Sequence, residues 1–292
     1  MFTPNDPDII HNLFLNDEAL RIRQDTHDRF SVPRIDFAAW ALSCVQWRGD
    51  ERVLDVGCGP GRWHSTLLHQ YPSIDYYGLD LHFNMLVNHP AQPLLAIGDA
   101  HDLPYPDDMF DVVMANHMLF HVQDIETTID EFRRVLKPEG VLMTTTNSAH
   151  NLPELQVLMR RAITLLAPPG TPHVQPPQPV STRFTLENGT QQLSRHFFAV
   201  VRHDLPSLFV FPSADPIVDY LDSARSVNES QLPPGVYWKD VLMIVREQAD
   251  RLLEHFGELV INKLNGVLIA TDKGDFIRQY LEYQSHSEKR YP

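Results

Sequence analysis

The sequence predicts an α/β fold built on one mostly parallel sheet, and two observations support this prediction. From Arg52 to Thr146, short apolar runs alternate with amphipathic stretches, a pattern typical of successive strand–helix units. The first apolar run leads directly into a glycine cluster, which suits a tight turn between a strand and the following helix. We therefore expect strands over the apolar runs and helices between them.

Turn and breaker residues mark the boundaries of the expected elements. The clearest helix spans Ile125 to Leu136, because its apolar side chains share one face and Lys137–Gly140 ends it. An amphipathic helix at 152–166 leads into a proline-rich loop at 168–180, which is too stiff for helix or central strand. The seven expected strands are 52–56, 76–79, 94–97, 110–115, 141–146, 199–211 with a break at Pro206, and 259–271.

Both ends of the chain add helices to this sheet. Apolar residues at helical spacing between positions 9 and 47, interrupted at Arg29–Pro33, predict two helices with a loop between them. Asp215 and Pro216 open a short helix, and a longer one at 239–256 ends at Gly257. The full prediction is a Rossmann-like, seven-stranded, mostly parallel sheet with an N-terminal helical lid and a helical insertion between strands six and seven.

Composition restricts the classes of function. The chain of 292 residues has a formal net charge of −14, with 43% hydrophobic and 21% charged residues, which indicates a globular protein. The negative charge and the lack of a basic stripe argue against nucleic acid as a partner and favour a small molecule. Cys44 and Cys58 lack the spacing of a disulfide framework or a zinc site, so no metal is expected.

Targeting signals are also missing from the sequence as given. Met1–Asp8 does not combine a basic segment with an apolar one, and no apolar run has the length needed to span a bilayer. We therefore expect a cytoplasmic protein without membrane association.

The glycine cluster after the first strand is the sharpest feature. The segment Val53–Gly61 runs from an apolar strand into glycines at positions 57, 59 and 61 and then into a helix. Glycine there lets a ligand approach where a Cβ would collide. A dinucleotide fingerprint would place its third glycine at position 62, which is Arg62. The spacing therefore argues against binding of a nicotinamide dinucleotide. The alternative to a ligand-binding loop is an ordinary tight turn between strand and helix.

Acidic residues follow the next two strands. Asp80 lies about 20 residues after the glycines, where a carboxylate can accept hydrogen bonds from ribose hydroxyls. Asp99, within Gly98–Ala100, can accept a hydrogen bond from an adenine amino group at the carboxyl edge of the sheet. Each alone could be a helix cap, but three signals in this order predict a nucleoside site.

These segments resemble the successive motifs of class I S-adenosylmethionine-dependent methyltransferases, in the branch called methyltransferase type 11. The resemblance rests on Val53–Gly61, Asp80, Gly98–Ala100, Phe110–Val113 and Leu136–Leu142. It is good from Arg52 to Thr146 and weak in the flanks, and Glu139 stands where the family usually has a glycine. It implies S-adenosyl-L-methionine as cofactor. The expected domains are then 1–50 for the lid, 51–150 for the cofactor-binding core, and 151–292 for the rest of the sheet with an acceptor-binding cap at 212–257.

The resemblance also implies which residues bind the cofactor. They are Asp55, Gly57, Gly59 and Gly61 around the methionine part, Asp80 at the ribose, Asp99 and Ala100 at the adenine, Leu81 and Met85 against the adenosine, Asn116 near the reactive end, and Arg29 at the carboxylate. For Arg29, a position on the solvated surface without contact to the cofactor is equally compatible with the sequence.

Candidate catalytic residues follow the fourth and fifth strands. His117 is a candidate general base, and His121 resembles a histidine frequent in this branch, although a packed structural role is its alternative. Asn147, His150 and Asn151 are candidates for the acceptor cleft or ordinary turn residues.

Methyl transfer to a small-molecule acceptor, by O-, N- or C-methylation, is the function that these expectations give. It needs alignment and exclusion of water, and a base only where the acceptor must lose a proton. Two alternatives stay open: a nicotinamide-dependent oxidoreductase on a similar sheet, and an S-adenosylmethionine-binding regulatory or scaffold protein without turnover. The sequence also allows a homodimer.

Overall fold

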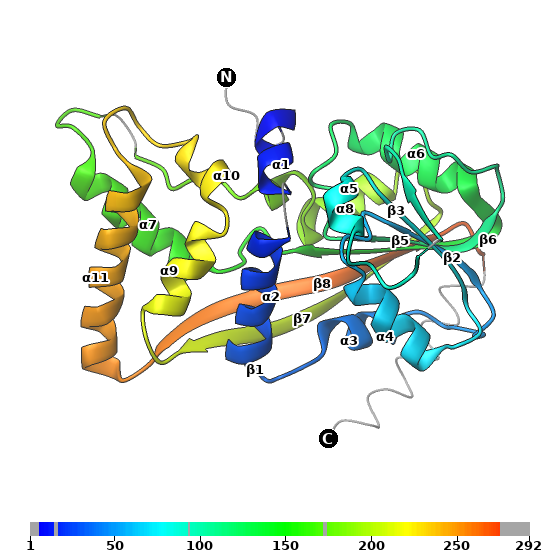
Figure 1. The fold of residues 1–292 in the computed structure, drawn as a ribbon, viewed down its shortest axis with the longest axis horizontal. Coiled ribbons are helices and arrows are strands. Elements are labelled where there is room, and N and C mark those ends of the chain that lie inside the picture. The colour runs from blue at the N-terminus through cyan, green and yellow to red at the C-terminus, as the bar shows by residue number, and fades with distance from the viewer. Residues whose placement is uncertain (1–5, 15–16, 93, 172–173, 275–292) are drawn as a thin grey trace.

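The computed structural model describes residues 6–14, 17–92, 94–171 and 174–274, and its centre is an eight-stranded sheet (Figure 1). The strands are β1 (Ser31–Val32), β2 (Arg52–Val56), β3 (Asp75–Asp80), β4 (Leu95–Ile97), β5 (Phe110–Asn116), β6 (Leu136–Asn147), β7 (Ala199–Phe211) and β8 (Leu259–Thr271). Their order across the sheet is β1-β7-β8-β6-β5-β2-β3-β4. Strands β2 to β6 pair in parallel, whereas β1, β7 and β8 are antiparallel to their neighbours. The Rossmann-like, mostly parallel sheet is therefore confirmed.

Helices cover the sheet and its carboxyl edge. They are α1 (Pro7–Leu13), α2 (Glu18–Phe30), α3 (Phe37–Leu42), α4 (Arg62–Gln70), α5 (Phe83–Leu86), α6 (Ile125–Val135), α7 (Pro153–Leu166), α8 (Leu186–Leu193), α9 (Asp215–Asp222), α10 (Arg225–Glu229) and α11 (Trp238–Phe256), with the 3-10 turn η1 (Val180–Arg183). Local signals explain several ends. The Asp124 side chain accepts a hydrogen bond from Thr127 N at the start of α6, and Gly257 ends α11 at a φ of 81°.

Three expectations from the sequence need correction. The sheet has eight strands and not seven, because Ser31 and Val32 pair with Phe209 and Leu208 where a loop was expected. Strand β7 is not broken at Pro206. Proline is tolerated there because β1 covers only positions 208 and 209, which leaves that edge of β7 open beside Pro206. The N-terminal segment also contains three helices where two were expected.

Alternation along the strands separates two hydrophobic layers. Val53 packs in the layer beneath α3 and α4, and the next residue, Leu54, packs on the opposite face with Phe132 of α6. Val53 and Leu54 are both fully buried. This two-residue period fixes which strand residues can reach which layer.

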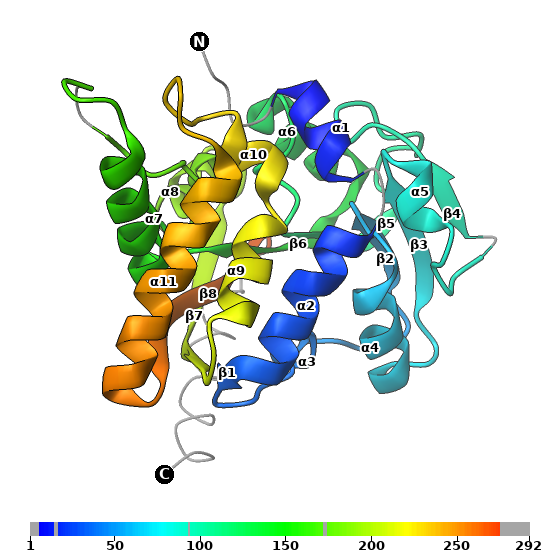
Figure 2. The same cartoon turned by 60° about the vertical axis from the view of Figure 1, so that its left-hand side comes forward.

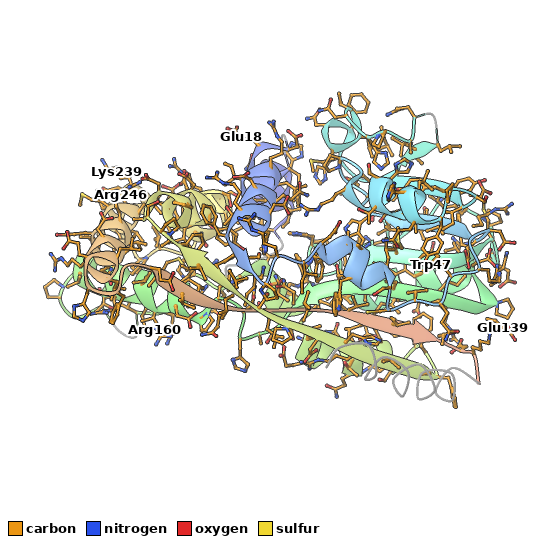
Figure 3. All side chains as sticks on the ribbon, turned by 90° about the horizontal axis from the view of Figure 1, so that it is seen from below. Glu18, Trp47, Glu139, Arg160, Lys239 and Arg246 are labelled. Atoms are coloured by element: carbon orange, nitrogen blue, oxygen red, sulfur yellow. The ribbon has the colours of Figure 1, made fainter. Side chains whose placement is uncertain are left out.

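A third cluster lies at the outer end of β7 and β8. Helices α7, α9 and α11 pack there around Trp238, Phe209 and Phe211. Figure 2 shows α1 and α2 between these helices and the βα part of the sheet. Arg160, Lys239 and Arg246 lie on the outer side of these helices (Figure 3). Among the residues that the structure describes, none of the helices combines the length and hydrophobicity of a membrane span.

Candidate functional site

A cavity of about 1080 Å³ lies at the carboxyl ends of the parallel strands. This is the edge where α/β sheets bind ligands, and the volume is at the upper end of what one drug-sized ligand occupies. One end of the cavity is formed by the segments that follow β2, β3, β4 and β5. The other end is formed by α2, α7, α9, β7 and β8. Two ligands can therefore lie next to each other in it.

The glycine loop after β2 forms one wall. Gly57 and Gly59 line the cavity with φ values of 69° and 54°, a region that favours glycine. A Cβ on Gly57 would lie 2.9 Å from the Met118 Cβ, so there is no room for a side chain. Gly57 N donates a hydrogen bond to Leu79 O at 2.7 Å, which ties the loop to the end of β3.

Asp55 and Gly61 lie behind this loop and not in the wall of the cavity. Asp55 shares a face of β2 with Val53, and its Oδ2 accepts a hydrogen bond from the Tyr76 hydroxyl at 3.0 Å. Burial raises the pKa of Asp55 to about 7, an effect that Tyr76 opposes. A Cβ on Gly61 would lie 2.6 Å from Pro90. These two residues therefore support the loop from behind, away from the lining.

Asp80 lines the cavity at the end of β3 and is already hydrogen bonded. Its Oδ2 accepts from Gly59 N and its Oδ1 from His82 N, both at 2.9 Å. The side chain is buried, with the residue 8% exposed. Since each carboxylate oxygen can accept more than one hydrogen bond, Asp80 can hold the loop and still accept from a ligand.

The other residues expected around a nucleoside also line the cavity. Asp99 Oδ1 accepts hydrogen bonds from His101 N at 2.9 Å and from the His101 ring, and these bonds lower the pKa of Asp99 against the effect of burial. Ala100 and Met85 are buried, and Leu81 is exposed. The structure thus brings together seven of the expected residues at this end: Gly57, Gly59, Asp80, Leu81, Met85, Asp99 and Ala100.

Asn116, at the end of β5, lines the cavity with unpaired polar atoms. It is 7% exposed, and neither side-chain Oδ1 nor Nδ2 has a hydrogen-bond partner among the described residues. Buried amides are rarely left in this state, because each unmade hydrogen bond costs free energy. The pairing that Asn116 lacks can be supplied by a ligand, so this residue fits a cofactor at this end.

His117 and His121 follow Asn116 and are both uncharged. Burial and the nearby positive charge of Arg23 lower the pKa of His117 to about 4. The same two causes lower the pKa of His121 to about 3. His117 has a φ of 53°, in the left-handed region that favours glycine. The His121 ring packs edge-on against Phe14, at 5.0 Å between centroids.

Arg29 lies outside the cavity. Its guanidinium donates to Asp25 at 2.9 Å on the exposed side of α2, so its expected contact with a cofactor carboxylate does not agree with this position. Of the three candidates that follow β6, Asn147 and Asn151 line the cavity and His150 does not. Asn147 accepts a hydrogen bond from Asn265, and Asn151 accepts one from Leu264 N.

Sequence reasoning missed the charged residues at the far end of the cavity. Arg23 and His27 of α2 and Lys263 of β8 all line it. Two signals could have indicated them: the spacing of four between Arg23 and His27 on one helix, and a single lysine inside an apolar strand. Within the described ranges, no group of three or more His, Cys, Asp or Glu side chains is arranged to hold a metal ion.

Comparisons with known proteins agree with this geometry. The family model described as "Methyltransferase domain" matches residues 54–144. A malonyl-[acyl-carrier protein] O-methyltransferase of Halorhodospira halophila is 38% identical over 111 residues, which is 36% of this chain and 38% of that protein. The enzyme of the same name from Xylella fastidiosa is 30% identical over 196 residues, or 63% of this chain and 64% of that protein. The match therefore spans less than two thirds of the length of either relative.

Solved structures give the fold. A phosphoethanolamine N-methyltransferase of Haemonchus contortus in complex with S-adenosyl-L-methionine superposes with a TM-score of 0.55 and 15% identity, over 94% of this chain and 61% of that one. At this identity the likeness concerns the fold. Residues 54–144 thus match the model of a methyltransferase domain, and the chain has the fold of this S-adenosyl-L-methionine-bound methyltransferase.

Proposed function

We propose that this protein is an S-adenosylmethionine-dependent methyltransferase that acts on a small-molecule acceptor. The observation that carries the proposal is the shared cavity. Gly57, Gly59, Asp80 and Asp99 line one end of it, and the other end is open to a second ligand. The formal charge of −14 supports a small molecule over nucleic acid as acceptor.

The residues at the first end fit the cofactor in chemical kind. Asp80 and Asp99 offer carboxylate oxygens to hydroxyl and amino groups, Gly57 leaves room for close approach, and Asn116 has an unpaired amide. When bound, S-adenosyl-L-methionine supplies an electrophilic methyl group. The protein's part is then to align the acceptor with that group and to exclude water, and both effects lower the barrier.

Removal of a proton is needed only for acceptors such as a hydroxyl. We propose His117 for this role. Its position in the cavity lining next to Asn116 supports this, and its lowered pKa leaves it neutral and able to accept a proton. The two relatives described above are O-methyltransferases by name, which supports oxygen as the first acceptor atom to screen. N- and C-methylation follow in the same screen.

The experiment is isothermal titration of the purified protein with S-adenosylmethionine, S-adenosylhomocysteine and NAD. We expect micromolar binding of the first two, no heat with NAD, and binding at least tenfold weaker in Asp80→Asn, because the amide group cannot accept at both positions. Asp75→Asn is the matched control, since Asp75 lies at the opposite end of β3 and contacts Arg52 on the surface.

Two outcomes would contradict the proposal. Absence of binding to both S-adenosyl compounds would reject the cofactor. Tight cofactor binding without methyl transfer to any acceptor in a broad screen would instead favour the regulatory or scaffold alternative. Light scattering on the same sample tests whether the protein forms the homodimer that its sequence allows.

A further inference from the structure

The far end of the cavity contains a cationic cluster, which we define as Arg23, His27, Ser31 and Lys263. All four residues line the cavity. The first two lie four positions apart on α2, so they face the same side of that helix. Ser31 follows in β1, and Lys263 enters from β8 on the opposite side. Tertiary structure therefore brings these groups together from the two ends of the chain.

Lys263 is buried in this cluster, with the residue 9% exposed. Its Nζ donates to Ser31 Oγ at 2.6 Å and lies 3.1 Å from His27 Nδ1. An ammonium group can only donate hydrogen bonds, so His27 Nδ1 is the acceptor. The proton of the neutral imidazole ring is therefore on Nε2. This agrees with the pKa of His27, which burial and then Lys263 hold well below its ordinary value. The ammonium also lies 4.5 Å from the centre of the Phe209 ring.

Arg23 is the second cation of the cluster. Within the described part of the chain, no carboxylate lies within ion-pair distance of it. Burial lowers the pKa of Arg23 from its usual range, and the charge of Arg23 opposes the rise that burial causes in the pKa of Tyr220. A guanidinium in this setting stays protonated, so the charge is retained.

The carboxylates in the lining are used elsewhere. Among the described residues that line the cavity, they are Asp28, Asp80 and Asp99. Asp28 forms an ion pair with Arg62 at 2.7 Å, and its charge only partly offsets the effect of burial on the pKa of Lys263. Asp80 and Asp99 are at the cofactor end. Two desolvated cations thus face one end of the cavity in a protein whose overall charge is −14.

Such an arrangement is costly for folding alone, because a buried charge without a partner loses its hydration. Binding of an anion would offset this desolvation cost. A carboxylate suits the site because its two oxygens match two N–H donors of a guanidinium. The surrounding lining is apolar and comes from several elements. It includes Leu20, Leu155, Met159, Leu205 and Leu221.

We propose that the cationic cluster binds a carboxylate group of the methyl acceptor, with an apolar part of that acceptor against the neighbouring leucines. The inference rests on the proposed function, since it assigns the second ligand of the same cavity. It concerns how the acceptor is anchored and leaves the methylated atom open. The overall negative charge does not prevent this, because local cations govern binding at short range.

One competing role for Arg23 is binding the carboxylate of the cofactor. Arg23 is also close enough to His117 and His121 for its charge to lower the pKa of both. We assign it to the acceptor because it shares a face of α2 with His27, which contacts Lys263. The two roles make different predictions for S-adenosylhomocysteine, which carries the same carboxylate as the cofactor. Binding of this compound therefore separates them.

The experiment uses the full chain saturated with S-adenosylhomocysteine and titrated with four eight-carbon probes: octanoate, octyl phosphate, octanol and octylamine. We expect octanoate to bind at least tenfold more tightly than octanol, and octylamine not to bind. In Arg23→Gln this preference for octanoate should disappear, whereas the affinity for S-adenosylhomocysteine should not change. Lys263→Met should reduce the preference in the same direction.

Arg21→Gln is the matched control, because Arg21 lies on the same helix, is exposed and pairs with Asp17. It should behave as the unmodified protein. Equal affinity for octanoate and octanol, in protein that binds S-adenosylhomocysteine normally, would overturn the anion site but leave the proposed function intact. Loss of S-adenosylhomocysteine binding in Arg23→Gln would assign this residue to the cofactor instead. Tighter binding of octyl phosphate than of octanoate would overturn the assignment to a carboxylate.

Discussion

The two ends of the cavity carry opposite charges and are built from different parts of the sequence. At the cofactor end, Asp80 and Asp99 already accept hydrogen bonds from nearby backbone groups, and every key residue lies between positions 53 and 116. At the acceptor end, Lys263 and His27 are 236 positions apart. Among the described residues, no carboxylate lies within ion-pair distance of Arg23, which is buried there. One end is thus locally determined, and its two carboxylates are paired, although the Asn116 amide there is not. The other end is assembled by tertiary structure and carries two buried cations.

This difference indicates how free energy is divided in the molecule. Groups that are paired in the empty protein stabilise the fold and position the cofactor with little reorganisation. Groups that are buried without partners destabilise the empty protein and gain stability only with a ligand. The comparison therefore predicts that removing a paired group and removing an unpaired group change the stability of the ligand-free protein in opposite directions.

The largest effect is expected from the cofactor end, in Gly57→Ala. The new Cβ would lie 2.9 Å from the Met118 Cβ at a φ of 69°. Steric overlap and positive-φ strain each cost about 1–3 kcal/mol, so S-adenosylhomocysteine should bind roughly 100-fold more weakly or not at all. Isothermal titration measures this loss directly.

Gly235→Ala controls for backbone strain alone. Gly235 has a φ of 83°, and a Cβ there would have no atom within 4 Å. It should lower the melting temperature slightly and leave cofactor affinity unchanged. Normal S-adenosylhomocysteine binding by Gly57→Ala would show that the loop does not approach the ligand, and the cofactor end would lose its main support.

Sequence patterns predicted the cofactor end because its information is local. Each strand of β2 to β5 is followed within a few residues by the group that lines the cavity, such as Gly57 after β2 and Asp80 at the end of β3. Strand period and turn chemistry are sufficient to place these groups at one edge. The same patterns could not show that Asp55 lies behind the loop, since that depends on the hydroxyl of Tyr76 on the neighbouring strand.

The acceptor end could not be predicted in this way. No spacing in the sequence links Arg23 with Lys263, because the link is the packing of α2 against the end of β7 and β8. Arg29 had been expected at a cofactor carboxylate, yet it lies on the exposed side of the same helix, bonded to Asp25. The helical phase that separates Arg23 from Arg29 is visible in the sequence, but which face would be covered is not.

A smaller effect is expected from pH at the acceptor end. Burial lowers the pKa of Lys263 to about 8, so its charge is lost as the pH rises from 7 to 9.5. The groups that face it do not titrate in this window: His27 is held neutral, Tyr220 has a raised pKa, and Arg23 stays charged. Octanoate affinity should therefore fall about tenfold, because loss of the lysine charge removes one charge-assisted hydrogen bond to the carboxylate.

Titration of octanoate at a series of pH values, with S-adenosylhomocysteine present, measures this dependence. In Lys263→Met the affinity should be weaker at pH 7 and constant up to pH 9.5. Asp28, whose charge favours the protonated lysine, pairs with Arg62 and should only shift the midpoint. An affinity that is constant with pH in the unmodified protein would remove Lys263 from the anion site and leave Arg23 alone.

The smallest effect sharpens the comparison within the cavity itself, because it concerns two equally buried asparagines. Asn116 and Asn265 are each 7% exposed and line the cavity, but Asn116 is unpaired and Asn265 donates to Asn147. Asn116→Ala removes an unpaired buried amide, which should raise the free energy of unfolding of the ligand-free protein by about 1 kcal/mol. Its melting temperature should therefore rise by about 2–4 °C. Asn265→Ala leaves Asn147 unpaired and should melt lower by a similar amount.

Thermal unfolding with and without S-adenosylhomocysteine tests both variants. Asn116→Ala should lose part of the stabilisation by ligand, whereas Asn265→Ala should retain it. A lower melting temperature for ligand-free Asn116→Ala would mean that this amide is satisfied in the empty protein, and its assignment to the cofactor would fail.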